Sequence, residues 1–515
     1  MRLVDHLDKG ASIDPGAPCL TCDGVSATYA EVQDLSRRVA ASLVAAGVGV
    51  GDRVAILSAN DPVAFTTVFG ISRAGAVWCP INPRNEASEN RELLDLFGCS
   101  VLVFQSSFAP LVDAIRGDLP GLHTLVCLDA DIEWSITWDA FLASGRAAGA
   151  EVDRPGDDDL AMVVGTGGTT GRPKGVMLTG RNLETMTALT LMSYPWPERG
   201  GRPVYLALAP LTHAAGVLCF PVLCRGGEIV VMRTPDVGTF LDLLESHHVT
   251  HTFLPPTLVY MVLDHPTLDE RDLSSLLCFW YGAAPMSTTR LEEALRRVGP
   301  VMAQLFGQTE APMMVTTMAP ADHFTADGAI ARDRLGSAGR ATPLTTVAIM
   351  GDDGRLLPRG ERGEIVVRGS LVMRGYLHDE AATAEASAHG WHHTGDIGYL
   401  DADDFLFIVD RAKDMVITGG FNVYSTEVEQ AVMAHPAVAD CAVVGLPDEK
   451  WGERLTAVVQ LRPEASLEVD ELTAFVKQRL GSVKTPKQVE VWDDLPRSKV
   501  GKVLKTDVKA RLSGG

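Results

Sequence analysis

The sequence predicts an α/β plus α+β protein in which a large N-terminal domain precedes a small C-terminal domain. Three observations lead to this prediction. Short apolar runs alternate with helical segments over most of the chain, which is typical of βαβ units around parallel sheets. Strands paired across Asp-Gly turns follow, and we expect them to form a distorted β-barrel. A new pattern of helices and strands after Arg411 predicts an independent α+β unit.

The parallel part of the N-terminal domain is predicted from its apolar pattern. Thr28 and Glu31 have the spacing of a capping box, and apolar residues then recur on one helical face up to Gly47. A helix over Val63–Ala74 is indicated in the same way. Short apolar runs, which are typical of strands buried on both faces, occupy Val54–Leu57, Ala76–Ile81, Leu160–Val164, Val204–Leu208, Glu228–Met232 and Thr252–Leu254.

The later part of the chain divides into two further units. Antiparallel strands are predicted over Thr346–Met350, Gly363–Gly369 and Phe405–Asp410. Beyond them, helices are predicted over Thr426–Ala434 and Val469–Leu480, and strands over Val438–Val444 and Leu455–Leu461. We therefore expect a large N-terminal domain at 1–410, a hinge at 411–414 and a small C-terminal domain at 415–515.

Composition and charge exclude several classes of protein. The chain has 515 residues, of which 46% are hydrophobic and 22% charged, so it can bury a large core and is not globally disordered. Its net charge of −21 argues against a general nucleic-acid binder. The stretch from Lys477 to Arg511 is basic, with ten Lys and Arg against four Asp and Glu, which suits either a solvated face or a domain that handles phosphates.

Cysteine usage and the apolar profile indicate the compartment. The nine cysteines are scattered, and Cys19 and Cys22 lack the second close pair that a zinc site needs. Free thiols in a reducing compartment are the better interpretation. The N-terminus has no apolar signal-peptide core, and we expect no transmembrane segment because no apolar stretch is long enough. A cytoplasmic location is therefore predicted.

The most informative stretch runs from Val163 to Val176 and reads VVGTGGTTGRPKGV. The four glycines before Lys174 allow backbone amides to approach an anion closely, three threonines add hydroxyl donors, and Lys174 adds a positive charge. The Walker A motif is excluded because Lys174 lies between Pro173 and Gly175 instead of opening a helix before Ser or Thr. The loop is thus predicted to hold phosphates outside the fold of a P-loop NTPase.

This loop and seven further motifs resemble, in the same order, the motifs of the adenylate-forming enzymes, which include acyl-CoA synthetases, luciferases and the adenylation domains of peptide synthetases. The seven are Pro210–Gly216, Tyr281–Pro285, Phe306–Glu310, Gly363–Gly369, Trp391–Asp396, Asp410–Asp414 with Gly419–Gly420, and Pro496–Lys502. Their order over nearly the whole chain makes coincidence negligible. The resemblance implies that the small C-terminal domain is mobile.

The resemblance implies a site for ATP, AMP and Mg²⁺. Glu310 would bind the metal ion together with Thr170, and Thr309 would contact the α-phosphate; a carboxylate beside phosphates suits Mg²⁺. Asp396 would accept hydrogen bonds from both ribose hydroxyls, and Arg411 would contact the ribose. The other implied nucleotide contacts are Thr166, Gly167, Gly168, Thr169, Thr170, Gly171, Lys174, Gly282, Ala283, Ala284, Pro285, Phe306, Gly307 and Gln308.

The implied catalytic residues are Lys502, His213, Glu310 and Thr309. Lys502 would reach the substrate carboxylate and the α-phosphate, where a cation stabilises the negative charge that develops. His213 would close the carboxylate pocket, as in the acyl-CoA-forming branch of the family. Amino-acid-activating relatives use an aspartate nearby, and Pro210–Gly216 contains no acid, so a substrate without an α-amine is favoured. The apolar residues that follow favour a hydrophobic acyl group: Val217, Leu218 and Phe220.

The resemblance also implies a hinge and a binding site for CoA. Lys413 corresponds to the hinge residue about which the small domain turns before the thioester forms. Gly419–Gly420 would line the pantetheine channel, and Trp451 would stack on the adenine of CoA. Arg84 and Lys484 stand where relatives contact the phosphates of CoA.

Two positions depart from the family's pattern. Gly165-Thr166-Gly167-Gly168 stands where the family has an aromatic residue followed by Thr-Ser-Gly. Gly167 thereby lacks a hydroxyl that would donate to the β- or γ-phosphate, although its backbone amide remains. We therefore expect only a modest loss of phosphate binding in ATP-dependent adenylation. Phe306 replaces the commoner tyrosine, which matters little for stacking.

The sequence is best interpreted as an ATP- and Mg²⁺-dependent carboxylic acid–CoA ligase. Its substrates would be a small-molecule carboxylic acid, ATP and coenzyme A, with no nucleic acid as a partner, and a homodimer is compatible with the sequence. Two alternatives within the class stay open: an enzyme specialised for thioesterification of a preformed acyl-adenylate, and an acyl-AMP ligase that loads a carrier protein in trans. A light-emitting oxygenase would share the same motifs. A non-catalytic nucleotide-binding protein is disfavoured because Lys174, Glu310, Asp396 and Lys502 are all present.

Overall fold

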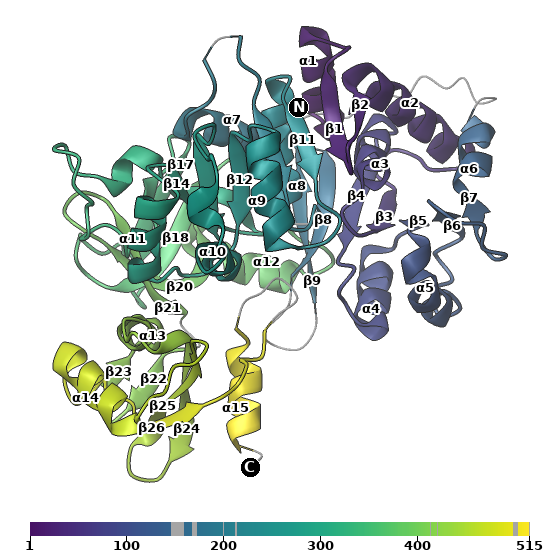
Figure 1. The fold of residues 1–515 in the computed structure, drawn as a ribbon. Coiled ribbons are helices and arrows are strands. Elements are labelled where there is room, and N and C mark those ends of the chain that lie inside the picture. Colours follow the sequence, from purple (N-terminus) through teal and green to yellow (C-terminus); the bar gives the residue numbers. More distant parts are fainter. Residues whose placement is uncertain are drawn as a thin grey trace.

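The chain folds into a large N-terminal part with two stacked sheets and a smaller C-terminal unit, which Figure 1 shows in olive to yellow below it. The computed structural model describes residues 1–145, 159–166, 173–198, 200–211, 214–411, 414–419, 421–497 and 503–513. This architecture confirms the predicted α/β plus α+β fold class. The domain boundary at 411–414 stays a prediction.

An eight-stranded sheet carries the glycine-rich loop. Its described strands lie in the order β19-β9-β8-β4-β3-β5-β6-β7, and all but β9 run in the same direction. These strands are β3 (Arg53–Leu57), β4 (Val77–Ile81), β5 (Val101–Phe104), β6 (Thr124–Cys127), β7 (Ile136–Thr137), β8 (Leu160–Thr166), β9 (Lys174–Thr179) and β19 (Gly375–Tyr376). The helices of this region are α2 (Tyr29–Ala45), α3 (Pro62–Arg73), α4 (Ala87–Phe97), α5 (Ala109–Arg116) and α6 (Trp138–Ser144). α2 and α3 pack against one face of the sheet, and α4 and α5 against the other.

A nine-stranded sheet carries the predicted adenine and metal motifs. Its described strands lie in the order β16-β15-β14-β13-β12-β10-β11-β1-β2. They are β1 (Pro18–Cys22), β2 (Val25–Thr28), β10 (Val204–Ala207), β11 (Glu228–Val231), β12 (His251–Leu254), β13 (Cys278–Gly282), β14 (Met302–Gln308), β15 (Ala311–Met318) and β16 (Arg340–Ala341). The helices beside it are α1 (Leu3–Ile13), α7 (Gly180–Ser193), α8 (Ala214–Cys224), α9 (Val237–Ser246), α10 (Pro256–Leu263) and α11 (Thr288–Arg297). α9, α10 and α11 pack against its outer face.

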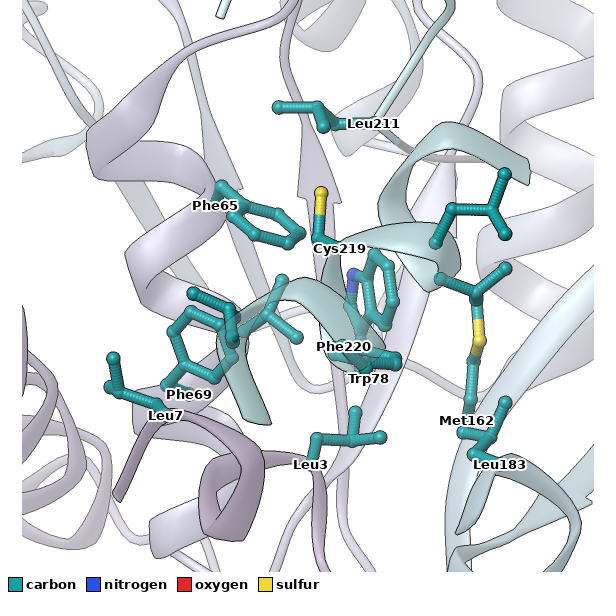
Figure 2. Packing of buried hydrophobic residues seen from close by; sticks show 14 of the residues in the cluster. Leu3, Leu7, Phe65, Phe69, Trp78, Met162, Leu183, Leu211, Cys219 and Phe220 are labelled. Carbon is teal, nitrogen blue, oxygen red and sulfur yellow. The ribbon is translucent and has the colours of Figure 1, made fainter. Parts of the chain in front are cut away.

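Buried helices fill the space between the two sheets. Figure 2 shows Trp78 of β4, Phe69 of α3, Phe220 of α8 and Leu183 of α7 packed into one cluster. α8 reads AAGVLCFPVLC and is apolar on all sides, as expected of a helix that is buried all round. Full burial of one such side chain stabilises the fold by roughly 1.5–3 kcal/mol. This core fixes the position of one sheet relative to the other, and so the position of the motifs at their edges.

An antiparallel sheet follows, where the distorted barrel was predicted. Its strands lie in the order β17-β18-β20-β21 and are β17 (Thr345–Met350), β18 (Gly363–Gly369), β20 (His392–Leu400) and β21 (Leu406–Arg411). α12 (Glu380–Ala386) lies between β19 and β20 in the chain. Short 3-10 turns lie at Ser106–Phe108, Leu268–Glu270, Pro320–His323 and Ala388–Gly390.

The C-terminal unit has its own sheet and core. The sheet order is β23-β22-β25-β24, with β26 beside β25. The strands are β22 (Val416–Thr418), β23 (Phe421–Val423), β24 (Val438–Asp448), β25 (Gly452–Leu461) and β26 (Gln488–Val491), and the helices are α13 (Ser425–Met433), α14 (Val469–Leu480) and α15 (Lys505–Ser513). Over the part of the chain that the structure describes, no helix combines the length and apolar character needed to cross a bilayer.

Candidate active site

The glycine-rich loop joins two antiparallel strands of the eight-stranded sheet. β8 ends at Thr166, two residues beyond the predicted end at Val164, because it continues to pair with β9 up to Lys174. Oγ1 of Thr166 donates a 3.5 Å hydrogen bond to the carbonyl oxygen of Lys174. Lys174 therefore opens a strand and not a helix, in agreement with the exclusion of a Walker A motif. Five residues predicted to contact phosphates lie outside the described residues: Gly167, Gly168, Thr169, Thr170 and Gly171.

The Phe306–Glu310 motif occupies the end of β14 and the turn into β15. The register between these strands shifts between Phe306 and Gln308, so Gly307 lies in a bulge. A Cβ atom on Gly307 would lie 2.4 Å from the backbone nitrogen of Met313, so the bulge requires glycine. Bulges redirect the side chains around them, and this one precedes the predicted α-phosphate and metal contacts.

Tyr376 connects the predicted metal ligand to the glycine-rich loop. Its hydroxyl donates a 2.8 Å hydrogen bond to Oε1 of Glu310, and Nζ of Lys174 lies 4.7 Å from the centre of its ring. The backbone makes the same connection, since the amide of Met373 donates to the carbonyl oxygen of Glu310 (2.7 Å) and Tyr376 pairs with Val176 of β9. Burial and the Glu310 carboxylate raise the pKa of the Tyr376 phenol, which therefore keeps its proton and can donate it.

Gln308 holds the predicted ribose ligand Asp396. Its Nε2 donates to Oδ2 of Asp396 (2.9 Å) and to the carbonyl oxygen of Thr394 (2.7 Å), which links β14 to β20. Its Oε1 lies 3.4 Å from Nε2 of His392, so that nitrogen donates; burial lowers the pKa of His392 and favours the neutral ring. Arg411 of β21 is the cross-strand partner of Asp396. The backbones of the two predicted ribose contacts thus lie side by side, and the side chain of Arg411 is outside the description.

The predicted adenine segment, Gly282–Pro285, begins at the end of β13. A Cβ atom on Gly282 would lie 2.3 Å from the carbonyl oxygen of Leu305 on β14, so only glycine fits there. Ala283 has a φ of +68°, in the left-handed region that residues other than glycine rarely adopt. Backbone strain of this kind is concentrated at ligand-binding sites. The approach of β14 explains Gly282, and contact of the segment with adenine stays a prediction.

The predicted CoA contact Trp451 lies directly against Gly419. The amide of Gly419 donates a 2.7 Å hydrogen bond to the carbonyl oxygen of Trp451, and a Cβ atom on this glycine would lie 3.3 Å from the indole ring. Nζ of Lys450 and Nζ of Lys487 lie 4.9 and 5.5 Å from the ring centre. An aromatic face with two cations beside it suits a purine that carries phosphates.

The two predicted phosphate contacts of CoA have different surroundings. Nζ of Lys484 lies 2.6 and 2.7 Å from the two carboxylate oxygens of Glu427, so its charge is already paired. Arg84 is exposed in the connection between β4 and α4. Lys487, which lies beside Trp451, is therefore a better candidate for a phosphate contact than Lys484.

Sequence reasoning missed four residues that the structure brings to the site: Tyr376, His392, Lys450 and Lys487. Tyr376 stands a few residues beyond the Gly363–Gly369 motif, and His392 stands inside the Trp391–Asp396 motif. Proximity to a motif was the only available signal for these two. Lys450 is adjacent to Trp451, but the contact of Lys487 depends on the pairing of β26 with β25.

The structure tests the remaining predicted site residues only in part. His213, Lys413, Gly420 and Lys502 lie outside the described residues. The apolar residues proposed to indicate the acyl group, Val217, Leu218 and Phe220, are buried in the core between the sheets. Packing therefore explains their apolar character, and they do not by themselves specify a substrate.

The donor set fits Mg²⁺ better than a metal with an all-protein shell. Within the described ranges, no three or more His, Cys, Asp or Glu side chains are grouped so that they could hold a metal ion. Mg²⁺ at nucleotide sites needs only one or two carboxylates, because phosphate oxygens and waters complete its shell. Glu310, half-buried and linked through Tyr376 to Lys174, meets that requirement.

Comparison with known proteins agrees with this arrangement. The profile of the AMP-binding enzymes matches residues 7–377, and that of the AMP-binding enzyme C-terminal domain matches residues 427–502. The chain belongs to the AMP-binding enzyme family. This result confirms the resemblance to adenylate-forming enzymes that the motifs indicated.

Individual AMP-binding enzymes match over nearly the whole chain. Medium/long-chain-fatty-acid–CoA ligase FadD8 of Mycobacterium tuberculosis is 37% identical, over 97% of this chain and 88% of that protein. Feruloyl-CoA synthase of Amycolatopsis is also 37% identical, over 98% of each chain. The solved structure of the amide bond synthetase McbA from Marinactinospora thermotolerans superposes with a TM-score of 0.89 at 29% identity and covers 99% of each chain.

Proposed function

We propose that this AMP-binding enzyme is an acyl-CoA ligase that activates an apolar carboxylic acid with ATP and then transfers the acyl group to CoA. The observation that supports it best is the pair of linked contacts at one site: Glu310 with Tyr376 and Lys174, and Gln308 with Asp396. The first provides charges for a triphosphate, and the second provides a fixed acceptor for a ribose.

The first step is formation of an acyl-adenylate. A carboxylate oxygen of the substrate attacks the α-phosphorus of ATP, the bond from that phosphorus to the bridging oxygen breaks, and pyrophosphate leaves. Lys174 and Lys502 would supply positive charge where negative charge develops, on the oxygens of the α-phosphate and of the departing pyrophosphate. Glu310 would hold Mg²⁺, which when bound neutralises phosphate charge. Asp396, held by Gln308, would fix the ribose and with it the α-phosphate.

The second step is thioester formation. The sulfur of CoA, having lost its proton, attacks the acyl carbonyl carbon, and the bond to the AMP oxygen breaks. For this step the small domain would turn about Lys413 and bring Gly419–Gly420 to the site. Trp451, with Lys450 and Lys487 beside it, would bind the nucleotide end of CoA.

The substrate proposal rests on two considerations. Pro210–Gly216 contains no acidic residue to hold an α-amine, which disfavours amino acids. By their names, the two 37% identical relatives act on a medium- or long-chain fatty acid and on an aromatic acid. Both acids have large apolar groups, so we include fatty and aromatic carboxylic acids in the proposed class.

A pyrophosphate-release assay over a panel of carboxylic acids, with and without CoA, tests the proposal. We expect release that depends on an apolar acid and on Mg²⁺, and acyl-CoA as the product when CoA is present. Release without acyl-CoA would point to another acceptor, such as a carrier protein. Thioester formation only from supplied acyl-adenylate would identify an enzyme of the second step alone.

Lys502→Ala sharpens this test. The variant is expected to lose acyl-adenylate formation and to keep most transfer from supplied acyl-adenylate to CoA, because Lys502 would face the site in the first step only. An equal loss of both steps would contradict the proposed rotation. The cytoplasmic location and a homodimer stay predictions.

A further inference from the structure

A buried cluster of four polar residues joins the last strand of the large domain to the small domain. Asp410, near the end of β21, is 3% exposed, and Ser425, the first residue of α13, is fully buried. The backbone amide of Ser425 donates to Oδ2 of Asp410, and the Ser425 hydroxyl donates to the same oxygen at 2.7 Å. The start of α13 is therefore capped by a carboxylate that belongs to another sheet.

The same serine binds the helix at the C-terminal end of the chain. Nζ of Lys505, the first residue of α15, donates to Oγ of Ser425 at 2.5 Å and lies 2.8 Å from Oε1 of Glu429. Oε1 of Glu429 also accepts a 2.8 Å hydrogen bond from the amide of Val443 on β24. The side chains of Lys505 and Glu429 are only 18% and 17% exposed. Ser425 thus lies between a cation and a carboxylate and bonds to both.

Burial makes each member of the cluster depend on the others. Burial alone would lower the pKa of Lys505, but the charges of Glu429 and Asp410 outweigh it and raise that pKa. A buried charge without a partner is costly, so two carboxylates held around one ammonium favour a single arrangement. Of the four side chains, that of Ser425 is the only one that both donates and accepts a hydrogen bond in this cluster. Its hydroxyl completes the chain of bonds from Lys505 to Asp410.

The positions of these residues in the chain connect the cluster to the chemistry. Asp410 directly precedes the predicted hinge at 411–414, and Lys505 comes three residues after Lys502. α15 is also attached to the small domain through Val508, which packs with β24 and β25 in a separate apolar cluster. Elsewhere on α13, Gln430 exchanges hydrogen bonds with Met286 and Thr288, just beyond the predicted adenine segment.

We propose that Ser425 and Lys505, with Asp410, hold the small domain in the orientation seen here, that this orientation is the one used for adenylation, and that the two are therefore positioning residues for that step. This inference rests on the proposed two-step function. Rotation of the small domain about the hinge would separate Ser425 from Asp410, so the contact acts in the first step and not in the second.

Ser425→Ala is the variant that tests the inference most directly. It removes the hydroxyl between the two domains and keeps both the Lys505–Glu429 pair and the backbone bond to Asp410, so the small domain should stay folded. We expect at least a fivefold lower rate of acyl-adenylate formation, with the KM for ATP little changed. Transfer from supplied acyl-adenylate to CoA is expected to stay at the wild-type rate or to exceed it.

Two further pairs of variants separate positioning from folding. Thr426→Ala removes the neighbouring hydroxyl, which takes no part in the cluster, and should leave both steps unchanged. Lys505→Arg should keep much of the adenylation rate that Lys505→Met loses, because a guanidinium can bond to both Ser425 and Glu429. Lys509→Met, one turn further along α15, is the matched control for Lys505→Met. Equal losses in both steps, or a wild-type adenylation rate in Ser425→Ala, would overturn the inference.

A second measurement needs no turnover. Hydrogen exchange on Asp410→Ala, without substrates, should be faster than in the wild type in the first turn of α13 and in 503–513, and unchanged in α14. If the wild-type protein released no pyrophosphate with any acid, the proposed function would fail, but this exchange result would still decide whether the cluster holds the domains together. Unchanged exchange in both segments would refute that role.

Discussion

The hydroxyl of Tyr376 lies 2.8 Å from Oε1 of Glu310, and Nζ of Lys174 lies 4.7 Å from the centre of the same tyrosine ring. One side chain therefore touches both the predicted metal ligand and the predicted phosphate-binding lysine. The hydrogen bond fixes one carboxylate oxygen. The ring attracts the ammonium through its π face without neutralising it, which leaves the charge of Lys174 for the phosphates.

The first prediction concerns Tyr376→Phe. The change removes a hydrogen bond to a charged group, worth about 1.5–3 kcal/mol, and keeps the ring beneath Lys174. We expect the Mg²⁺ concentration for half-maximal adenylation to rise by about tenfold, since tenfold corresponds to ~1.4 kcal/mol. Pyrophosphate release titrated with Mg²⁺ measures this, and Tyr399→Phe, which removes a hydroxyl on another strand, β20, is the control.

A double-mutant cycle shows whether Tyr376 acts through the carboxylate. Glu310→Gln alone should slow adenylation severely, because it removes the proposed metal ligand. If the tyrosine acts by orienting Glu310, Tyr376→Phe should add little loss in the Glu310→Gln background. Full additivity of the two losses would show that the hydrogen bond is irrelevant to the metal ion.

The second prediction concerns the Gln308–Asp396 pair and sugar selectivity. Gln308→Met removes the donor that holds Oδ2 of Asp396 while conserving side-chain volume. The wild type is expected to prefer ATP over 2′-deoxyATP in kcat/KM by about tenfold or more, as the loss of a hydrogen bond to a charged group implies. In the variant this preference should shrink to about threefold, because a carboxylate that is free to rotate accepts hydrogen bonds from the two ribose hydroxyls less well. An unchanged preference would remove Gln308 from the ribose site.

The sequence alone predicts interactions between residues that are close in the chain, and it misses contacts between distant segments. Thr28 and Glu31 of the capping box are three residues apart, and both of its hydrogen bonds are present in the structure. The strands β17 and β18, on either side of the turn at Gly351–Gly354, were also predictable, because apolar runs and turns are local features. The contact of Tyr376 with Glu310 depends on the pairing of β19 with β9, which are far apart in the chain. No periodicity in the sequence predicts that pairing.

Burial gives a second explanation for the apolar residues that follow Pro210–Gly216. Val217, Leu218 and Phe220 are apolar, and a pocket lining and a core produce the same composition. The structure places all three in the core between the two sheets. Sequence motifs can thus identify the nucleotide site, where glycine, charge and order are specific. They do not identify the acid.

The third prediction concerns pH and His323, which is fully buried. Its Nδ1 donates to the carbonyl oxygen of Ala319 (3.0 Å), so Nε2 accepts from the hydroxyl of Tyr281 (2.9 Å). Burial lowers the pKa of His323 from 6.5 to about 4. As pH falls from 6.5 to 4, the unfolded chain binds a proton here that the folded chain does not. The free energy of unfolding therefore falls in this window, by roughly 1.4 kcal/mol per pH unit.

His323→Gln tests this sign. The Tm of the wild type should drop between pH 6.5 and 5, and the Tm of the variant, although lower throughout, should drop less steeply. His123→Gln changes an exposed histidine and should keep the wild-type slope. A slope in His323→Gln equal to that of the wild type would mean that His323 does not take up a proton on unfolding.

The last prediction separates two neighbouring lysines at the proposed CoA site. Nζ of Lys487 lies 5.5 Å from the ring centre of Trp451, whereas Nζ of Lys484 is paired with both oxygens of Glu427. Lys487→Met should therefore raise the KM for CoA several-fold by removing a cation near the nucleotide end, and Lys484→Met should change it little. Neither variant should alter the KM for pantetheine, which lacks the nucleotide and its phosphates. Thioester formation from supplied acyl-adenylate, measured with both thiols, gives these values independently of adenylation. A larger effect of Lys484→Met, or an equal effect of Lys487→Met on pantetheine, would show that the nucleotide of CoA does not bind at Trp451.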